Sequence, residues 1–325
     1  MRRMALVSLL VGFLFLRSAV GQQNQMLADV FEQNSIPFPP SSVPDLNAPI
    51  TSYATLNDDQ EFLIAYYLVA PQNELRFPLL LTRFDKQAGT WQHVSLTDLK
   101  VKIFQGTKEE GQADCIGSVL SVERNGEWYY LNLHWNPSAG CLLILKHDLA
   151  VSQTLTGGVA AFFKSGILVY SGNMVHFASV HPTTLLLYDP VTHQTQQLYP
   201  QKDDPFRDAF SARLERVIDQ KQCAENNWSC KPDEFTTDIN YPIEVNDETN
   251  SLAFRIAFEP EGFLTRERAE SSGKWDDHYV YVYQLDAPRW REFSVYDLQP
   301  KFGTESLKDL LTPEKLRQVL ATPPR

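Results

Sequence analysis

The 325-residue sequence predicts an all-β fold, and three observations support this. Short runs of β-branched and aromatic residues alternate with turn residues from about residue 51 to about residue 300. The turns recur in a similar order, and an aspartate follows the third run of each group. Helical periodicity is confined to short segments near the two ends and to one segment after residue 200.

The predicted strands are rich in Val, Ile, Leu, Tyr and Trp and are separated by Gly, Asn, Asp, Ser and Pro. Asn125-Gly126 separates two of them and is typical of a type I′ hairpin turn, because both residues tolerate positive φ. The strands are expected at Glu61–Ala70, Pro78–Phe84, Ser118–Glu123, Trp128–Trp135, Cys141–Leu145, Ile167–Tyr170, Val175–Val180, Thr184–Tyr188, Ser251–Phe258 and Tyr279–Leu285.

These strands form a degenerate internal repeat of a strand, a turn, a second strand, an apolar third strand ending near an aspartate, and a thinner fourth strand. The first turns are Asn57-Asp58-Asp59, Asn125-Gly126, Ser171-Gly172-Asn173 and Asn246-Asp247-Glu248. The fourth strands are expected at Trp91–Leu96, Val151–Leu155, Thr195–Tyr199 and Trp290–Leu298. The aspartates are 63, 41 and 97 residues apart, and the last interval contains an insertion, residues 201–240. These four aspartates are Asp85, Asp148, Asp189 and Asp286.

Repeats of about 40–60 residues, each a four-stranded antiparallel meander, are typical of β-propellers. Leu185–Pro200 is similar to the outer hairpin of a propeller blade, and the resemblance covers about residues 51–300. It concerns the architecture and identifies no functional family. The resemblance implies four blades, or five if residues 100–117 and 156–166 supply further strands. The alternative fold is an irregular β-sandwich.

The N-terminus has the order of a secretory signal peptide. Two arginines precede an apolar run, Ala5–Leu16, and small residues at Ala19 and Gly21 predict cleavage after Gly21. The alternative is an uncleaved membrane anchor, although the run is shorter than the about 20 apolar residues that span a bilayer. The sequence therefore predicts a secreted or periplasmic protein, and no later stretch is apolar enough for a transmembrane helix.

Charge excludes one class of partner. The whole chain has a net charge of −11, and loss of residues 1–21 removes three arginines. The mature chain would have 304 residues, with 26 basic against 40 acidic side chains and a net charge of −14. Such a surface repels the phosphates of nucleic acids, so a nucleic-acid partner is not expected.

Three segments flank or interrupt the β domain predicted over residues 51–300. Residues 22–50 form a Pro-rich N-terminal extension, with a short helix expected around Met26 to Gln33. The insertion 201–240 has a helix that starts at Asp204-Pro205. Residues 301–325 form a helical tail, with helices expected at Thr304–Leu311 and Pro313–Leu320.

The four cysteines are Cys115, Cys141, Cys223 and Cys230. An even number in an oxidising compartment predicts two disulfides. Of three connectivities, proximity in sequence favours Cys223–Cys230 together with Cys115–Cys141, and buried thiols are the alternative. No Cys-x-x-Cys occurs and no His has ligand spacing to a Cys pair, so no metal or other cofactor is expected.

Known catalytic motifs are absent from the sequence. His147-Asp148 and Asp276-Asp277-His278 each place a carboxylate beside an imidazole, as an acid–base site requires. His134 lies within an apolar strand and is interpreted as a structural histidine. Asp58-Asp59 with Glu61 is interpreted as a solvated turn, because the spacing does not suit calcium.

Tryptophans are the remaining candidates for binding residues. Those within predicted strands are explained by packing, whereas Trp228 and Trp275 lie in polar loops and are candidate contact residues. With Asp277 and His278 they form the predicted binding residues. The sequence favours an exported, non-catalytic binding or scaffold protein with a glycan or protein partner. The alternative is a secreted carbohydrate-active hydrolase or lyase that uses carboxylates from several blades.

Overall fold

The fold is described from a computed structural model, which covers residues 25–41, 44–69, 75–103, 110–135, 139–163, 166–171, 174–176, 179–181, 184–201, 236–259, 278–294 and 306–321. The predicted signal peptide and most of the insertion lie outside these ranges. None of the helices within them is long and apolar enough to cross a membrane. The chain forms two compact units. The first comprises Met1–Leu99, Ile116–Leu133 and Leu145–Val151, and the second Lys100–Cys115, His134–Ile144 and Ser152–Arg325.

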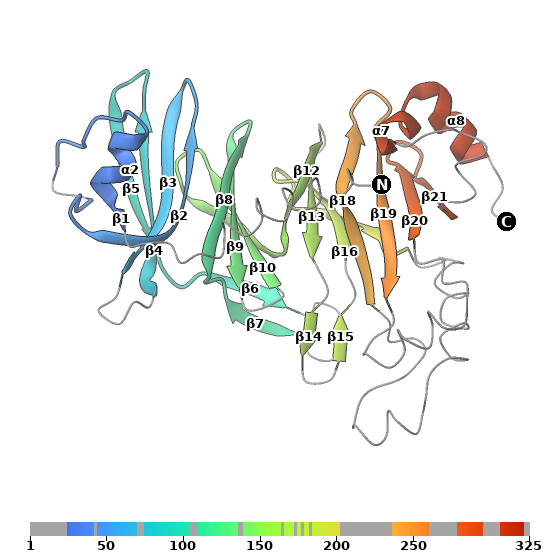
Figure 1. Ribbon diagram of the computed structural model, residues 1–325, viewed down its shortest axis with the longest axis horizontal. Coiled ribbons are helices and arrows are strands. Elements are labelled where there is room, and N and C mark those ends of the chain that lie inside the picture. Colours follow the sequence, from blue (N-terminus) through green and yellow to red (C-terminus); the bar gives the residue numbers. More distant parts are fainter. Residues whose placement is uncertain are drawn as a thin grey trace, which may run out of the picture. The chain divides into compact units, whose positions relative to one another are not determined.

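The first sheet is a five-stranded antiparallel meander (Figure 1). Its strands lie in the order β1-β2-β3-β4-β5, and the four main strands follow the predicted repeat. They are β1 (Gln25–Met26), β2 (Pro49–Asn57), β3 (Glu61–Val69), β4 (Leu75–Asp85) and β5 (Thr90–Leu96).

One face of the first sheet is covered by helix α2 (Leu27–Gln33). The carboxylate of Asp29 accepts the backbone N–H of Met26 at 3.2 Å, which stabilises the helix N-terminus. Leu27, Val30 and Phe31 of α2 pack against alternate residues of β3, namely Phe62, Ile64 and Tyr66. The short helix predicted in residues 22–50 is confirmed, and it contributes to the hydrophobic core of the first unit.

The second sheet has the order β11-β10-β9-β8 and contributes residues to both units. Its strands are β8 (Ser118–Asn125), β9 (Trp128–Trp135), β10 (Ala139–Lys146) and β11 (Val151–Thr156). The chain turns between β8 and β9 as expected, and Gly126 has φ +59°, but neither Asn125 nor Glu127 has positive φ. The predicted type I′ turn, which needs positive φ at both central residues, is therefore wrong. Within the first unit β2 and β8 lie beside each other, and the backbone N–H of Val119 donates to Ser52 Oγ at 2.6 Å.

The third sheet has the order β12-β13-β16-β17, which corrects the predicted strand assignment. Its first strand comes from residues that were considered for a fifth blade, and Val175–Val180 is not one of its strands. Gly166 explains the difference: at φ +155° a Cβ atom would lie 2.3 Å from the carbonyl oxygen of Tyr188, so this connection between β12 and β13 needs glycine. The strands are β12 (Gly158–Phe163), β13 (Gly166–Ser171), β16 (Thr184–Tyr188) and β17 (Thr195–Tyr199).

Two further hairpins stand apart from the four main sheets. β6 (Lys100–Ile103) pairs with β7 (Gly111–Asp114), and β14 (Met174–His176) pairs with β15 (Ser179–His181). In the range 100–117, the other piece considered for a fifth blade, the described strands β6 and β7 form a separate two-stranded sheet.

The fourth sheet is the meander β18-β19-β20-β21. It consists of β18 (Thr236–Asn246), β19 (Ser251–Glu259), β20 (His278–Gln284) and β21 (Arg289–Ser294). β18 begins inside the range 201–240 that was assigned to the insertion. Helices α7 (Leu307–Leu310) and α8 (Pro313–Ala321) lie where the two C-terminal helices were expected.

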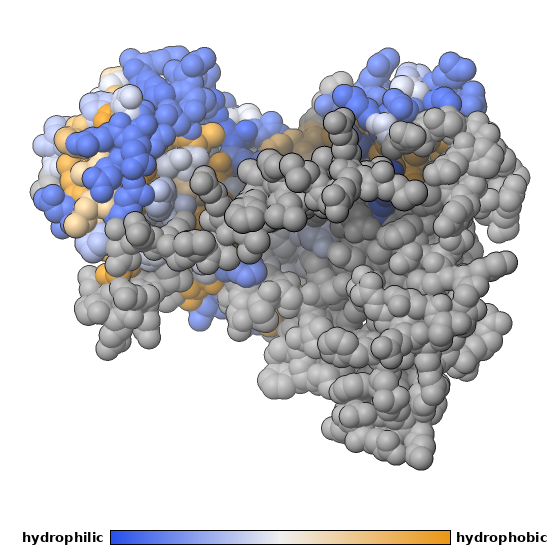
Figure 2. All heavy atoms as spheres, in the orientation of Figure 1, coloured by the Kyte–Doolittle hydropathy of each residue, from blue (hydrophilic) through white to orange (hydrophobic). Residues whose placement is uncertain are grey.

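These two helices pack on one face of the fourth sheet. Val280 and Val282 of β20 contact the leucines of α7 and α8, whereas Tyr281 belongs to the core shared with the third sheet. Figure 2 shows hydrophilic residues on the outer side of this helical region. Alternation along β20 thus directs one set of side chains to the helices and the other to the neighbouring sheet.

The recurring aspartates have a physical role in the turns. Asp85 Oδ1 accepts the backbone N–H groups of Gln87 and Ala88 at 2.9 and 2.8 Å. Asp189 Oδ1 accepts those of Val191 and Thr192 at 2.8 and 3.2 Å. Such Asx turns reverse the chain between the third and fourth strands. The all-β class and the repeated four-stranded meander are confirmed, and the sheets fit a propeller-like architecture.

Candidate functional site: a charged cluster in the first unit

The centre of the cluster is Glu61, the first residue of β3. Its side chain is 3% exposed, and both carboxylate oxygens have partners from the second sheet. Arg124 Nη1 of β8 donates to Oε1 at 2.9 Å, and the hydroxyl of Tyr129 on β9 donates to Oε2 at 2.5 Å. A buried carboxylate of one sheet is therefore held by charged and polar groups of the next.

Arg124 also reaches a second carboxylate. Its Nη2 donates to Asp58 Oδ2 at 2.8 Å, in the turn between β2 and β3. Asp58 is itself oriented, because its Oδ1 accepts the backbone N–H groups of Gln60 and Glu61 at 2.8 and 3.0 Å. The planar guanidinium thus bridges a turn aspartate and a strand glutamate.

Arg83 and His147 complete the cluster on its more exposed side. Arg83 Nε lies 3.9 Å from Glu61 Oε2, and Nη1 donates to the backbone carbonyl of His147. The ring of His147 stacks on that of Tyr129, with centroids 5.9 Å apart, and its Nε2 lies 3.9 Å from Glu61 Oε2. Since the His147 side chain is 46% exposed, it is where the cluster meets solvent.

The surroundings shift the proton affinity of two groups near the cluster. Burial, and then the hydrogen bond to Glu61, raise the pKa of the Tyr129 hydroxyl, which therefore remains a neutral donor at neutral pH. The backbone N–H of Ala88 lowers the pKa of Asp85, and Arg83 and His147 lower it further by charge. Charges of both signs thus compensate one another across this part of the first unit.

This arrangement suits a structural link better than acid–base chemistry. A general acid or base must exchange its proton with a ligand within hydrogen-bonding reach. Arg124 and Tyr129 occupy the positions around Glu61 that such a ligand would need. Among the described residues, no group of three or more His, Cys, Asp or Glu is placed to hold a metal ion.

The structure changes three interpretations of single residues. Glu61 is buried and ion-paired, so its interpretation as part of a solvated turn is wrong. His134, interpreted as a structural histidine within an apolar strand, lies at an exposed position of β9. His147 joins the cluster, whereas Asp148 serves its own turn by accepting the N–H of Ala150 at 3.0 Å.

Only one of the four predicted binding residues lies within the described ranges. Trp228, Trp275 and Asp277 lie outside the described residues, and His278 opens β20, where its backbone pairs with Ala257. Sequence reasoning missed Arg83, Arg124 and Tyr129. The one available signal was Arg83, a charged residue within the otherwise apolar run Pro78–Phe84.

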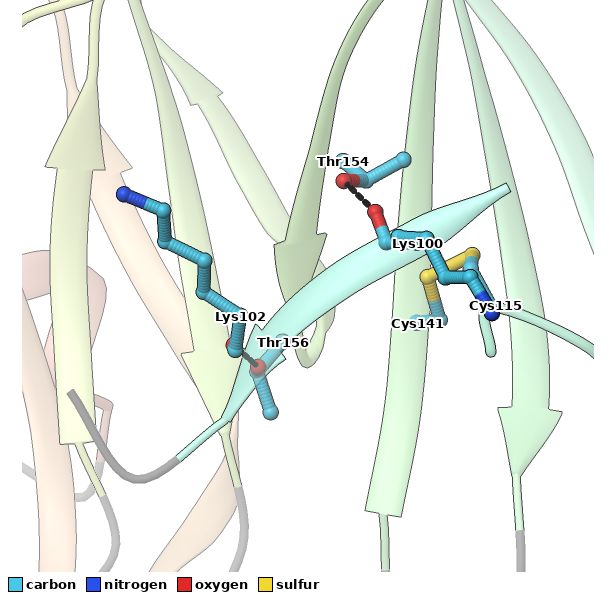
Figure 3. The surroundings of a disulfide bond; sticks show 6 residues. All are labelled: Lys100, Lys102, Cys115, Cys141, Thr154 and Thr156. Carbon is cyan, nitrogen blue, oxygen red and sulfur yellow. Dashed lines mark hydrogen bonds between the residues drawn. A yellow bond between two sulfur atoms is a disulfide. The ribbon is translucent and has the colours of Figure 1, made fainter. Parts of the chain in front are cut away.

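One predicted disulfide is confirmed, and it lies in the second unit. Cys115, directly after β7, is bonded to Cys141 on β10, and both residues are fully buried. Figure 3 shows that the hairpin is also held from β11, where the hydroxyls of Thr154 and Thr156 donate to the carbonyls of Lys100 and Lys102 at 2.5 and 2.7 Å. The predicted Cys223–Cys230 bond lies outside the described residues.

Comparisons with known proteins leave the family open. No protein-family model matches the chain, and no curated protein matches its sequence. Among solved structures, one similar chain is "A subtype N10 neuraminidase-like protein of A/little yellow-shouldered bat/Guatemala/060/2010", with 7% identity and a TM-score of 0.28. The alignment covers 75% of this chain and 59% of that structure, so this chain spans less than two thirds of its length. Similarity at this level assigns neither a family nor an activity.

Proposed function

We propose that the chain is an exported protein with a non-catalytic binding or scaffold role. The observation that supports this most strongly is the occupancy of the Glu61 carboxylate. Arg124 and Tyr129 donate to its two oxygens from the neighbouring sheet. The buried carboxylate of the first unit therefore serves to hold two sheets together. A scaffold needs such rigid connections, and charge-assisted hydrogen bonds supply them with defined geometry.

The cysteine chemistry supports export. Disulfides persist in oxidising compartments and are rare in reducing ones. The Cys115–Cys141 bond is buried, and it joins the β6–β7 hairpin to the second sheet. Together with the leader predicted at residues 1–21, this bond favours a secreted or periplasmic protein.

The first experiment separates a scaffold from a carbohydrate-active enzyme. The purified protein, Glu61→Gln and the matched control Asp59→Asn, an exposed acid in the same turn, are assayed on immobilised glycans and chromogenic glycosides. We expect no hydrolysis by any of the three, and a lower Tm for Glu61→Gln alone. Hydrolysis that Glu61→Gln abolishes at a temperature where it remains folded would favour the hydrolase instead.

The second experiment tests export. The full chain is produced in a secreting host, and the N-terminal residue and the mass without reductant are determined for the recovered protein. We expect a chain that begins at Gln22 and is found outside the cytoplasm. Leu10→Arg, which interrupts the apolar run, serves as the control and should remain inside the cell. Equal retention of both chains would contradict the proposal.

A further inference from the structure

Residues 36–41, between α2 and β2 of the first unit, form a proline-rich segment that belongs to no helix or strand. Their sequence is Ile-Pro-Phe-Pro-Pro-Ser, so every residue from 36 to 40 either is a proline or precedes one. Proline fixes φ at about −65°, and the residue before a proline is restricted to extended conformations. Steric restriction therefore holds this segment close to a polyproline II helix until the chain bends at Pro40 and Ser41.

The exposure of the segment follows the period of such a helix. A polyproline II helix has three residues per turn, so Pro37 and Pro40 lie on one face. Both are exposed, whereas Pro39 is buried. Phe38, on the third face, is 47% exposed, which leaves much of an apolar ring in water. Two of the three faces are thus accessible to a partner.

The segment is fixed to the first unit on both sides. Ile36 is 6% exposed in the core that α2 covers, and its backbone N–H donates to the carbonyl of Phe31 at 2.9 Å. Further along the chain, Leu46 packs against the same core, and its carbonyl accepts the N–H of Ala28 at 3.0 Å. Because the segment is already ordered, binding a partner costs little conformational entropy.

The chemistry of the segment defines the class of partner. Prolines have no N–H, so this stretch offers apolar rings together with carbonyl acceptors. Grooves lined by tyrosine and tryptophan match this pattern, because their rings pack on prolines and their O–H and N–H groups donate to carbonyls. No charged residue occurs from residue 33 to residue 44, and Glu32 and Asp45 flank this stretch. A complementary groove is therefore aromatic at its centre and basic at its rim.

We propose that residues 37–40 are a docking motif for a protein domain with an aromatic groove that binds polyproline II. Pro37 and Pro40 present one apolar face to this groove, and Phe38 adds a second contact beside them. The inference goes beyond the scaffold role proposed above and depends neither on export nor on Glu61. Its failure would therefore leave that role unaffected.

The test is an isothermal titration of the purified protein with a panel of isolated WW, SH3 and EVH1 domains, which have grooves of this kind. We expect at least one domain to bind, and Phe38→Ala and Pro37→Ala each to weaken its affinity by about 10-fold or more, as for other apolar anchor residues. Both positions are exposed, so both variants should keep the Tm of the unmodified protein. The matched control is Val191→Ala, which removes an apolar side chain that is 74% exposed in the second unit and should leave the affinity unchanged.

A second measurement locates the contact in the unmodified chain. In the isotope-labelled protein, the bound domain should shift the amide signals of Ile36, Phe38 and Ser41 and leave that of Val191 in place. The absence of binding to every domain of the panel would overturn the proposal. So would an affinity that is equal in the unmodified chain and the double variant Pro37→Ala/Phe38→Ala, or shifts confined to other parts of the chain.

Discussion

Within each unit one sheet packs against the next, and the side chains at this contact are charged in the first unit and aromatic in the second. In the first unit, the contact between the first and second sheets is centred on the buried Glu61 carboxylate, with Arg124 and Tyr129 as its donors. In the second unit, the contact between the third and fourth sheets is aromatic. Phe254 stacks on Tyr281 with centroids 4.8 Å apart, and both rings meet Tyr199 edge-on at 5.7 and 5.6 Å.

Both contacts include a glutamine at the same position of the repeat. Gln92 on β5 donates to the carbonyl of Asp148, and Gln196 on β17 donates to the hydroxyl of Tyr283, at 2.6 and 3.0 Å. Each glutamine pairs with the residue two positions before the repeat aspartate, Arg83 and Leu187 respectively. The repeat therefore prescribes where strands and turns lie, and leaves the packing chemistry between sheets free to differ.

The largest expected effect is in the aromatic contact. Phe254→Ala should lower the free energy of unfolding of the second unit by about 3–5 kcal/mol, because it removes a fully buried ring and leaves a cavity. Urea unfolding followed by a probe in each unit measures this. Phe254→Leu, which retains most of the volume, is the control and should cost less. Equal losses in both variants would show that the ring geometry, rather than volume, sets the stability.

The charged contact should respond almost as strongly. Glu61→Gln should lower the free energy of unfolding of the first unit by about 3 kcal/mol, because Arg124 then loses its buried counter-charge and keeps only the more exposed Asp58. Urea unfolding again gives the value, and the exposed Asp59→Asn should change it little. A double-mutant cycle with Arg124→Gln isolates the pair, and we expect a coupling of about 1–3 kcal/mol. Additive effects would mean that the two side chains act independently.

The shared glutamines should contribute less. Gln92→Ala and Gln196→Ala should each cost about 1 kcal/mol, the usual contribution of one hydrogen bond. Tm measurements on both variants test whether the two positions are equivalent. Gln197→Ala is the control, because Gln197 is the neighbouring exposed residue and bonds locally to the carbonyl of Pro200. A much larger loss for one glutamine would contradict their equivalence.

The smallest expected effect is a pH dependence of the stability of the first unit. Burial lowers the pKa of His93 on β5 below its ordinary value of 6.5, so the folded state favours the neutral ring. Above pH 6.5 the ring is neutral in both the folded and the unfolded chain, so the full stability is present. As the pH falls below 6.5, the unfolded chain binds the proton more readily and stability is lost. The urea midpoint of the first unit should therefore fall between about pH 7.5 and pH 5, and His93→Gln should reduce the change. An unaltered slope in this variant would assign the pH dependence to another group.

Local features were predictable from the sequence because local chemistry produces them. The place of the turn at Gly126, the helix at residues 27–33, the two C-terminal helices and the Asp85 and Asp189 turns depend on residues a few positions apart. The Cys115–Cys141 pairing was favoured by its short separation of 26 residues. By contrast, the third sheet was misassigned because Ser171-Gly172-Asn173 resembles a repeat turn, whereas the required glycine is Gly166.

By itself, the sequence determined the all-β class, the positions of most strands and the repeated turn that ends each third strand. Only the tertiary structure decided that Glu61 is buried, that Arg124 and Tyr129 hold it, and that aromatic rings take the corresponding place in the second unit. The reason is separation along the chain. Glu61 meets residues 63 and 68 positions away, and such contacts depend on how sheets stack rather than on any local pattern.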